Sequence, residues 1–181
     1  MSESPLPDPS PRHVAAFRAV ALRMHGQPFV NQAIEVEAVG FAPWQGHWLG
    51  VMVTPWFMNL VLLPRERSQW QPLAPGAKRK LRFPAGVFEF IGASEETVGE
   101  HQTCSLFSPM HEFADHAAAR LVAQLATEAL FDGAHAERPE FPSANLSPPL
   151  APDAPASAVD AVSKRDFLRG RFGGGDGGAR R

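Results

Sequence analysis

Residues 44–64 read WQGHWLGVMVTPWFMNLVLLP and form the most apolar stretch of the chain. They contain three of the four tryptophans and no Lys, Arg, Asp or Glu. Thr54-Pro55 separates two hydrophobic runs, residues 48–53 and 56–63. A buried helix can show the same continuous pattern, but the short lengths and the β-branched and aromatic residues favour strands. We therefore expect two central strands, covered on both sides, in a small globular domain.

Outward from this pair, four more segments have the patterns of strands. Residues 33–41 and 87–91 alternate apolar and polar side chains, and residues 102–107 follow an acidic stretch that we expect to be exposed. The lysine-rich residues 78–83 fit an edge strand, because lysines discourage pairing with another sheet. Short turns join neighbouring segments, so we expect antiparallel pairing.

A helix is expected at each end of this series of strands. Ser10-Pro11 and Gly26 mark the start and the end of an amphipathic first helix. Ser108-Pro109 marks a second start, and that helix is expected to run to about Phe131. Together the elements predict an α+β fold, a two-layer sandwich in which an N-terminal and a C-terminal helix flank an antiparallel sheet. The apolar stripe expected on the second helix consists of Phe113, Ala117, Leu121, Leu125 and Ala129, joined by Val122 and Leu130.

One domain is expected, at residues 11–133, because 181 residues with 44% hydrophobic content can bury one sizeable core. Residues 1–10 read as a Pro-rich disordered lead-in, and residues 134–162 as a Pro/Ala-rich disordered linker. Residues 163–181 are expected to be a disordered, basic, Gly-rich tail. This tail carries six Lys or Arg and two Asp, a net charge of +4, so the first 162 residues carry −6.

Cys104 is the only cysteine of the chain, which excludes an intrachain disulfide and weakly favours a reducing compartment. The first residues have no apolar run of the kind found in secretory signals. The longest apolar run is far shorter than the ~20 residues that a membrane-spanning helix needs. We therefore expect a cytoplasmic protein without membrane insertion and without a nucleic-acid partner.

Catalytic motifs are missing from the sequence. We find no phosphate-binding or dinucleotide-binding glycine pattern, no nucleophile elbow and no HExxH zinc motif. Cys104 with His47 or His101 has the residue types of a nucleophile and its base, but nothing local supplies an orienting third group. We therefore expect a protein that is not an enzyme, with no catalytic residue and no cofactor.

A metal site is the next alternative, since His101, Cys104, His111 and His116 are residue types that bind zinc or nickel. The spacing argues against it. On a strand, His101 and Cys104 would point to opposite faces, and on a helix His111 and His116 would diverge. A buried structural cysteine with solvent-facing histidines is favoured, so no metal site is expected, and nickel or iron delivery by these four residues stays an alternative function.

The C-terminal segment 163–169, SKRDFLR, is close to the twin-arginine export pattern S-R-R-x-F-L-K, with Lys in place of the first Arg. It cannot act as an export signal, because such signals are N-terminal and continue into an apolar stretch. One interpretation is a capped helical turn in a solubilising tail, since Ser163 and Asp166 have capping-box spacing. The other is a mimic of an export signal that uses Lys164, Arg165, Phe167 and Leu168.

Three segments resemble the [NiFe]-hydrogenase assembly chaperones of the HybE/HupJ type. They are VEAVGFAPWQGHWLGVMVTPWFMNLVLLP (36–64), FPAGVFEFI (83–91) and CSLFSPMHEFADHAAA (104–119), within a likeness over residues 29–131. The resemblance implies a helix-flanked antiparallel sheet and makes residues 11–133 a hydrogenase assembly chaperone domain. Some relatives carry a fused rubredoxin-like domain that needs four cysteines, and with Cys104 alone no iron site is implied.

The resemblance also implies a function. Members of this family look like cytoplasmic accessory proteins of membrane-bound uptake hydrogenases that bind precursor subunits and delay twin-arginine export until assembly is complete, a proofreading role. The partner would be the small subunit with its signal peptide, the large subunit, or both, and other maturation factors are possible. Glu35 and Glu37 could attract the basic part of such a signal.

The aromatic stretch is where we expect such a client to bind. Trp and Met are residue types that pack adaptably against an apolar segment of another protein. Val51, Val53, Leu60 and Leu62 are expected to be structural. The expected client-binding residues are Trp44, His47, Trp48, Trp56, Phe57, Met58 and Asn59.

Overall fold

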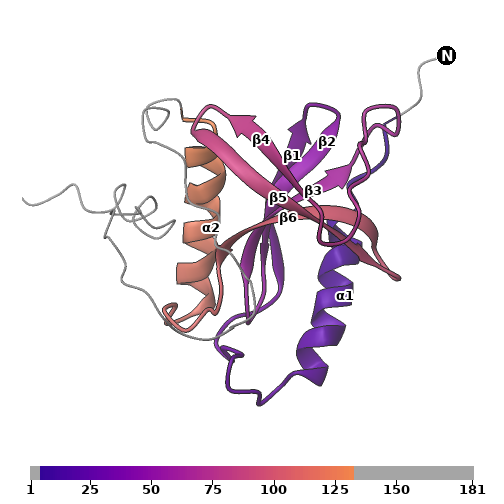
Figure 1. Ribbon diagram of the computed structural model, residues 1–181. Coiled ribbons are helices and arrows are strands. Elements are labelled where there is room, and N and C mark those ends of the chain that lie inside the picture. Colours follow the sequence, from indigo (N-terminus) through magenta and orange to yellow (C-terminus); the bar gives the residue numbers. More distant parts are fainter. Residues whose placement is uncertain (1–4, 133–181) are drawn as a thin grey trace, which may run out of the picture.

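The computed structural model describes residues 5–132, which fold into two helices and six strands (Figure 1). The predicted linker and tail, residues 134–162 and 163–181, lie outside the described residues. The elements are α1 Ser10–Arg23, β1 Glu37–Trp44, β2 His47–Val53, β3 Met58–Pro64, β4 Lys78–Phe83, β5 Gly86–Glu95, β6 Gly99–Phe107 and α2 His116–Leu130.

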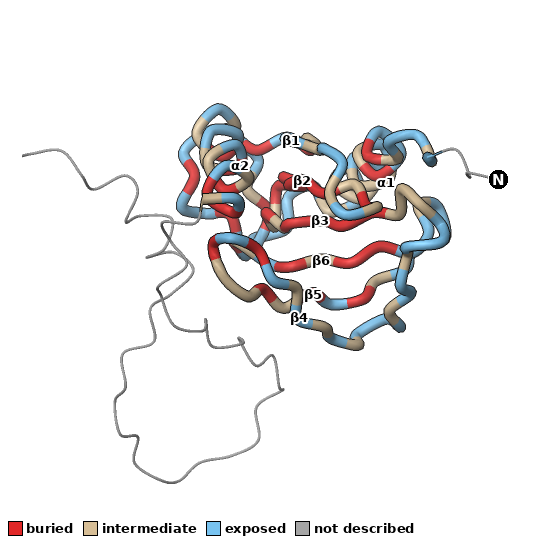
Figure 2. Tube along the Cα trace, turned by 90° about the horizontal axis from the view of Figure 1, so that it is seen from above, coloured by how far each residue is buried: buried red, intermediate tan, exposed pale blue. Residues whose placement is uncertain are grey.

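All six strands form one antiparallel sheet in the order β1-β2-β3-β6-β5-β4. The meander β4-β5-β6 folds back so that β6, not β4, pairs with β3. β1 and β4 are the edges of the sheet, and of the interior strands Figure 2 shows β2, β3 and β6 largely buried. The predicted edge position of Lys78–Phe83 is confirmed, because β4 ends the sheet.

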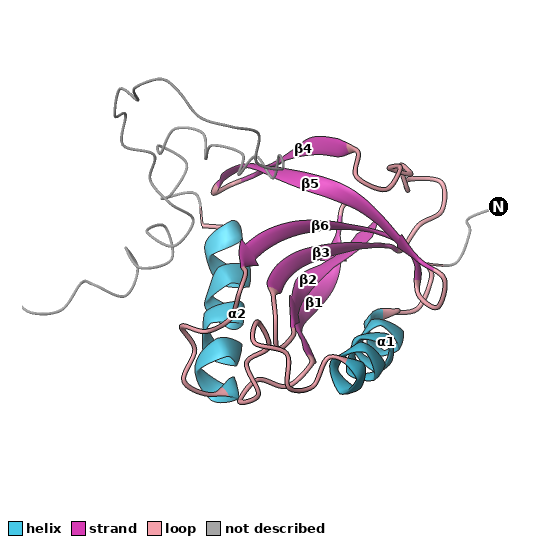
Figure 3. Ribbon diagram, turned by 60° about the horizontal axis from the view of Figure 1, so that its bottom comes forward, coloured by secondary structure: helices cyan, strands magenta, loops and turns pink. Residues whose placement is uncertain are grey.

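The helices lie on opposite faces of the sheet (Figure 3). Val51, Leu60 and Cys104 point to the face that α2 covers, and they belong to the larger core cluster. Met52 and Val61 point to the other face, where Phe17 and other residues of α1 pack on them. The predicted α+β class, with an antiparallel sheet flanked by an N-terminal and a C-terminal helix, is therefore confirmed.

The central hairpin follows the pattern read from the sequence. Val51, Val53, Leu60 and Leu62 are all buried, as expected for structural positions. They pair across β2 and β3 on the face of α2, with Val51 opposite Leu60. Thr54-Pro55 lies in the turn between the two strands. Both runs are covered on each side of the sheet.

The second helix differs from the sequence prediction. It begins at His116, seven residues after Pro109, and Asp115 caps it by accepting a hydrogen bond from the backbone N–H of Ala118 at 2.8 Å. The expected stripe is wrong at Ala117 and Leu121, which are exposed. Small side chains let the helix approach the sheet closely, and the buried face consists instead of Ala119, Ala123, Ala126, Ala129 and Leu130.

The expectation of a solvent-facing His101 is also wrong, because β6 begins at Gly99 and buries this side chain against α1. Its ring lies edge-on to that of His13, with centroids 5.2 Å apart.

Neither α1 nor α2 is long and apolar enough to cross a membrane, and the described residues contain no other helix.

Candidate functional site

The seven residues expected to bind a client do not form one patch. Trp44 and His47 lie on the face of α2, Trp48 and Asn59 on the face of α1, and Trp56 and Phe57 in the turn between β2 and β3. Met58 is fully buried in the larger core cluster. The hairpin therefore presents three separate places to test.

The β2–β3 turn holds Trp56 and Phe57 beside α1. The Thr54 hydroxyl accepts the backbone N–H of Phe57 at 2.9 Å and that of Trp56 at 3.3 Å, which fixes the turn. The Phe17 ring of α1 lies edge-on to both aromatic rings, with centroids 5.5 Å from Phe57 and 6.4 Å from Trp56. Both turn residues are half-buried, so one side of this aromatic cluster faces solvent.

Trp48 is covered by the segment that precedes α1. Its indole N–H donates to the backbone oxygen of Leu6 at 3.1 Å, and the Arg65 guanidinium lies 5.5 Å from the ring centroid. The Leu6 N–H in turn donates to the Arg65 oxygen at 2.7 Å. Next to this surface, Asn59 has a buried Oδ1 without a hydrogen-bond partner among the described residues. Such an unpaired acceptor is costly, and function is one common reason for it.

Trp44 and His47 lie at the other face. Trp44 stacks on Phe83 with centroids 4.4 Å apart, and the His47 ring lies between Trp44 and Trp70. Burial lowers the pKa of His47, the positive charge of Arg79 lowers it further, and nearby Glu66 opposes this. His47 is therefore a neutral, buried side chain at neutral pH.

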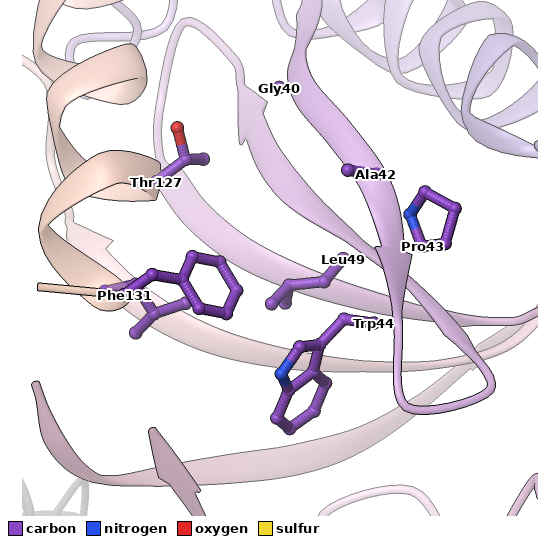
Figure 4. Close-up of a pocket in the computed structure, with 8 residues that line it drawn as sticks. Gly40, Ala42, Pro43, Trp44, Leu49, Thr127 and Phe131 are labelled. Carbon is purple, nitrogen blue, oxygen red and sulfur yellow. The ribbon is translucent and has the colours of Figure 1, made fainter. Parts of the chain in front are cut away.

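A small pocket of about 70 Å³ opens beside Trp44 (Figure 4). Its walls come from β1 around Gly40, from Leu49 of β2 and from the end of α2 at Thr127, Leu130 and Phe131. The volume suits one apolar side chain of a partner. Thr127 packs directly against Gly40, whose positive φ of 66° marks the irregularity in the pairing of β1 with β2.

A much larger groove, of about 420 Å³, lies between the end of α1 and the segment that leads to β1. This segment leaves the end of α1 and crosses the bottom of the view to reach β1 (Figure 1). Leu22 at the groove is 80% exposed, and the neighbouring Phe29 is 45% exposed. The apolar lining of the groove consists of Ala21, Leu22, Val30, Ile34, Val36 and Pro55. Pro55 directly precedes Trp56, and Val36 of the groove belongs to the same core cluster as Phe17 and Phe57.

One hydrogen bond joins the two walls of the groove, and two others connect the segment that leads to β1, and the first residue of β1, with α2. Arg18 donates from Nη2 to the Val36 oxygen at 3.5 Å, and the Glu35 N–H donates to Nδ1 of His116 at 3.2 Å. His116 Nε2 donates to Glu37 at 2.8 Å. Arg18, His25 and Glu35 therefore set the charge of the rim, around an apolar floor.

This groove was not predicted as a site from the sequence. Its lining comes from α1, from residues 30–36 and from Pro55, and periodicity within one segment cannot bring these together. Two signals were available: Leu22, an apolar residue outside the apolar face of the first helix, and Glu35, which was expected to attract the basic part of an export signal.

The four residues of the alternative metal site are not gathered. In residues 5–132 no group of three or more His, Cys, Asp or Glu is arranged to hold a metal ion. Cys104 lies in the core on the face of α2, whereas His101 contacts α1 on the opposite face. His116 is paired with Glu37.

Comparison with known proteins gives the family. The family model for [NiFe]-hydrogenase assembly chaperone HybE matches residues 8–170. HupJ of Bradyrhizobium diazoefficiens, a hydrogenase expression/formation protein, is 38% identical over 159 residues, which cover 86% of this chain and 83% of that protein. HybE of Escherichia coli strain K12, a hydrogenase-2 operon protein, is 31% identical over 97 residues, 53% of this chain and 60% of that protein.

A probable rubredoxin HupJ of Rhodobacter capsulatus is 46% identical over 101 residues, or 55% of this chain. The match spans only 36% of that longer protein. The solution structure of HybE from Escherichia coli has the same fold, with a TM-score of 0.58 at 21% identity over 87% of this chain and 98% of that one. On these matches, this chain belongs to the HybE family of [NiFe]-hydrogenase assembly chaperones.

Proposed function

We propose that this protein is a cytoplasmic, non-enzymatic chaperone in the maturation of a membrane-bound [NiFe] uptake hydrogenase. It binds a precursor subunit, the small subunit with its twin-arginine signal or the large subunit, and delays export until assembly is complete. Family membership supports the general role. The observation that supports a client site is the apolar groove between α1 and residues 30–36, with Leu22 80% exposed at its edge.

The groove has the chemistry that an apolar client segment needs. Large exposed apolar side chains that gather at one hollow mark interaction surfaces on soluble proteins. Covering Leu22 alone contributes about 1.5–3 kcal/mol of hydrophobic free energy if the burial is complete. Glu35 on the rim provides an acidic partner for the basic residues that precede the apolar part of a twin-arginine signal.

The aromatic residues extend this site in our proposal. Trp56 and Phe57 form its continuation along α1, and Trp48 with Asn59 lies farther along the same face. Trp44, on the opposite face, acts as a second contact through the small pocket beside it, and buried His47 supports the Trp44 ring. Met58 supports the turn from inside the core.

Substitution of Leu22 by Glu tests the site. A charged side chain in the groove must be desolvated when the client binds, so we expect precursor-subunit affinity to fall at least about 10-fold, a change of 1.4 kcal/mol. The measurement is titration of purified precursor subunit, with its signal attached, into the full chain.

Leu121→Glu is the matched control, because Leu121 is also an exposed leucine, 54% exposed on α2, and does not line the groove. It should leave the affinity unchanged. Equal binding by the Leu22→Glu variant would remove the groove from the proposal, and failure of the wild-type chain to bind any precursor would remove the function itself.

A further inference from the structure

We propose that the C-terminal segment 163–169 binds in the groove of its own chain and competes there with the client. This inference rests on the proposed function for the role of the groove. It assigns the twin-arginine-like sequence, which lies outside the described residues, to a described surface. The family match ends at residue 170 and thus includes this segment.

The chemistry of the two partners is complementary. Along the segment, Lys164, Arg165 and Arg169 are basic, Asp166 is acidic, and Phe167 and Leu168 are apolar. The groove offers a carboxylate on one rim, a guanidinium on the other, and an apolar floor between them. The rim groups are Glu35, Arg18 and His25, and the floor is formed by Val30, Ile34, Val36 and Pro55.

The apolar pair provides most of the attraction. Phenylalanine buries 150–250 Å² when covered, and phenylalanine with leucine would together fill a hollow of this size better than either alone. The groove, at about 420 Å³, is six times larger than the pocket beside Trp44, at about 70 Å³. The small pocket therefore cannot accept the pair, although it lies closer to the end of α2.

The length of chain allows the contact. Thirty-one residues separate Asp132, the last described residue, from Lys164, and a segment of that length can span up to about 100 Å. With a linker of the Pro/Ala-rich composition found here, the effective concentration of the segment at the groove is on the order of 1 mM. A segment with a dissociation constant of about 0.1 mM would then weaken client binding about 10-fold.

The first experiment measures this competition in the full chain. The probe is a synthetic twin-arginine signal peptide with the pattern S-R-R-x-F-L-K followed by an apolar run. Replacing Phe167 and Leu168 by Ser should tighten its binding about 10-fold. Phe172→Ser, which changes a phenylalanine of the same tail outside the segment, should leave the affinity as in the wild type. Equal affinity of the wild type and the double-serine variant overturns the inference.

The second experiment locates the segment by disulfide formation. Gly170→Cys is combined either with Gln32→Cys, an exposed position on the groove, or with Arg82→Cys, an exposed position on edge strand β4. The second pair is the stricter control, because the Ala85 N–H after β4 donates to the Leu130 oxygen at 3.1 Å and so places β4 near the end of α2, from which the chain continues toward Gly170. Cys104 is buried in the core.

We expect the Gln32 pair to cross-link faster than the Arg82 pair, and the Phe167/Leu168 double-serine change to abolish the difference. Equal or reversed rates overturn the inference.

Failure of this inference and failure of the proposed function are distinguishable. If the probe binds the groove but neither the serine changes nor cross-linking has an effect, the inference fails and the proposed function stands. If cross-linking favours Gln32 and no precursor binds, the proposed function fails.

Discussion

His13 is a histidine of α1 that is buried between the helix and β6. Its Nδ1 lies 3.2 Å from the Pro9 oxygen, to which it donates in the neutral tautomer, and its Nε2 has no hydrogen-bond partner among the described residues. The ring of His101 lies edge-on to it. Burial lowers the pKa of His13 to about 4, with further lowering by His101 and Arg12 and opposing effects from Pro9 and Asp8.

This lowered pKa predicts acid sensitivity. In the unfolded chain His13 takes up a proton near its ordinary pKa of 6.5, whereas the folded protein resists uptake until about pH 4. Its contribution to the free energy of unfolding is therefore fully present above pH 6.5 and is lost as the pH falls toward 4, by up to about 3 kcal/mol.

Urea unfolding at pH 7, 5.5 and 4 measures this loss, and the quantity of interest is the difference between variants, since carboxylates also contribute to the slope. His13→Asn keeps an N–H near the Pro9 oxygen but cannot titrate, so it should show a smaller loss of stability between pH 7 and 4. His25→Asn, an exposed substitution, should keep the wild-type slope. An unchanged slope in the His13 variant would contradict the prediction.

At the scale of elements, α2 packs on the sheet through alanine. Ala119 and Ala123 have no exposed area, and Ala126 and Ala129 continue the same face. Leu121 of α2 and Phe131, which follows the helix, are about half exposed, and among the larger apolar side chains Leu130 at the helix end is buried. Close approach of a helix to a sheet leaves no room for a larger side chain at the contact.

Two substitutions on α2 should therefore have effects opposite to what hydrophobicity alone predicts. Ala123→Leu adds apolar atoms at a filled contact and should lower the free energy of unfolding by about 1–3 kcal/mol. Leu121→Ala removes apolar atoms from an exposed position and should change it by less than about 0.5 kcal/mol. The midpoint of urea unfolding measures both changes. A larger loss of stability in the Leu121 variant than in the Ala123 variant would contradict this prediction and favour the helix stripe expected from the sequence.

The same contrast explains what the sequence could predict. The strands of the hairpin and the edge strand 78–83 followed from alternation and composition, which are local properties. The face of α2 was not predictable in this way, because leucine outweighs alanine in any hydrophobic pattern and close packing is decided by the partner element. Among the seven expected client residues, the sequence could not separate buried Met58 from half-buried Trp56, since strand direction changes at the turn.

At the scale of the whole molecule, Asn31 connects the groove to the opposite side of the sheet. Its side-chain amide donates to the backbone oxygens of Met110 and Phe113, at 2.9 and 2.8 Å, in the loop before α2. Its backbone N–H donates to the Pro55 oxygen at 2.8 Å. One residue thus joins the groove segment, the β2–β3 turn and the approach to α2.

Loss of this connection should change both stability and client binding. Asn31→Asp keeps the shape but replaces the amide donor by a carboxylate that faces two carbonyl oxygens, so we expect a loss of about 1–3 kcal/mol in the free energy of unfolding. Because Val30 and Pro55 line the groove on either side of these bonds, affinity for the signal peptide should fall as well. Gln27→Glu, an exposed change of the same charge in the same loop, controls for charge alone. Urea unfolding and peptide titration measure the two effects, and a loss of stability with unchanged affinity would show that the groove keeps its shape without Asn31.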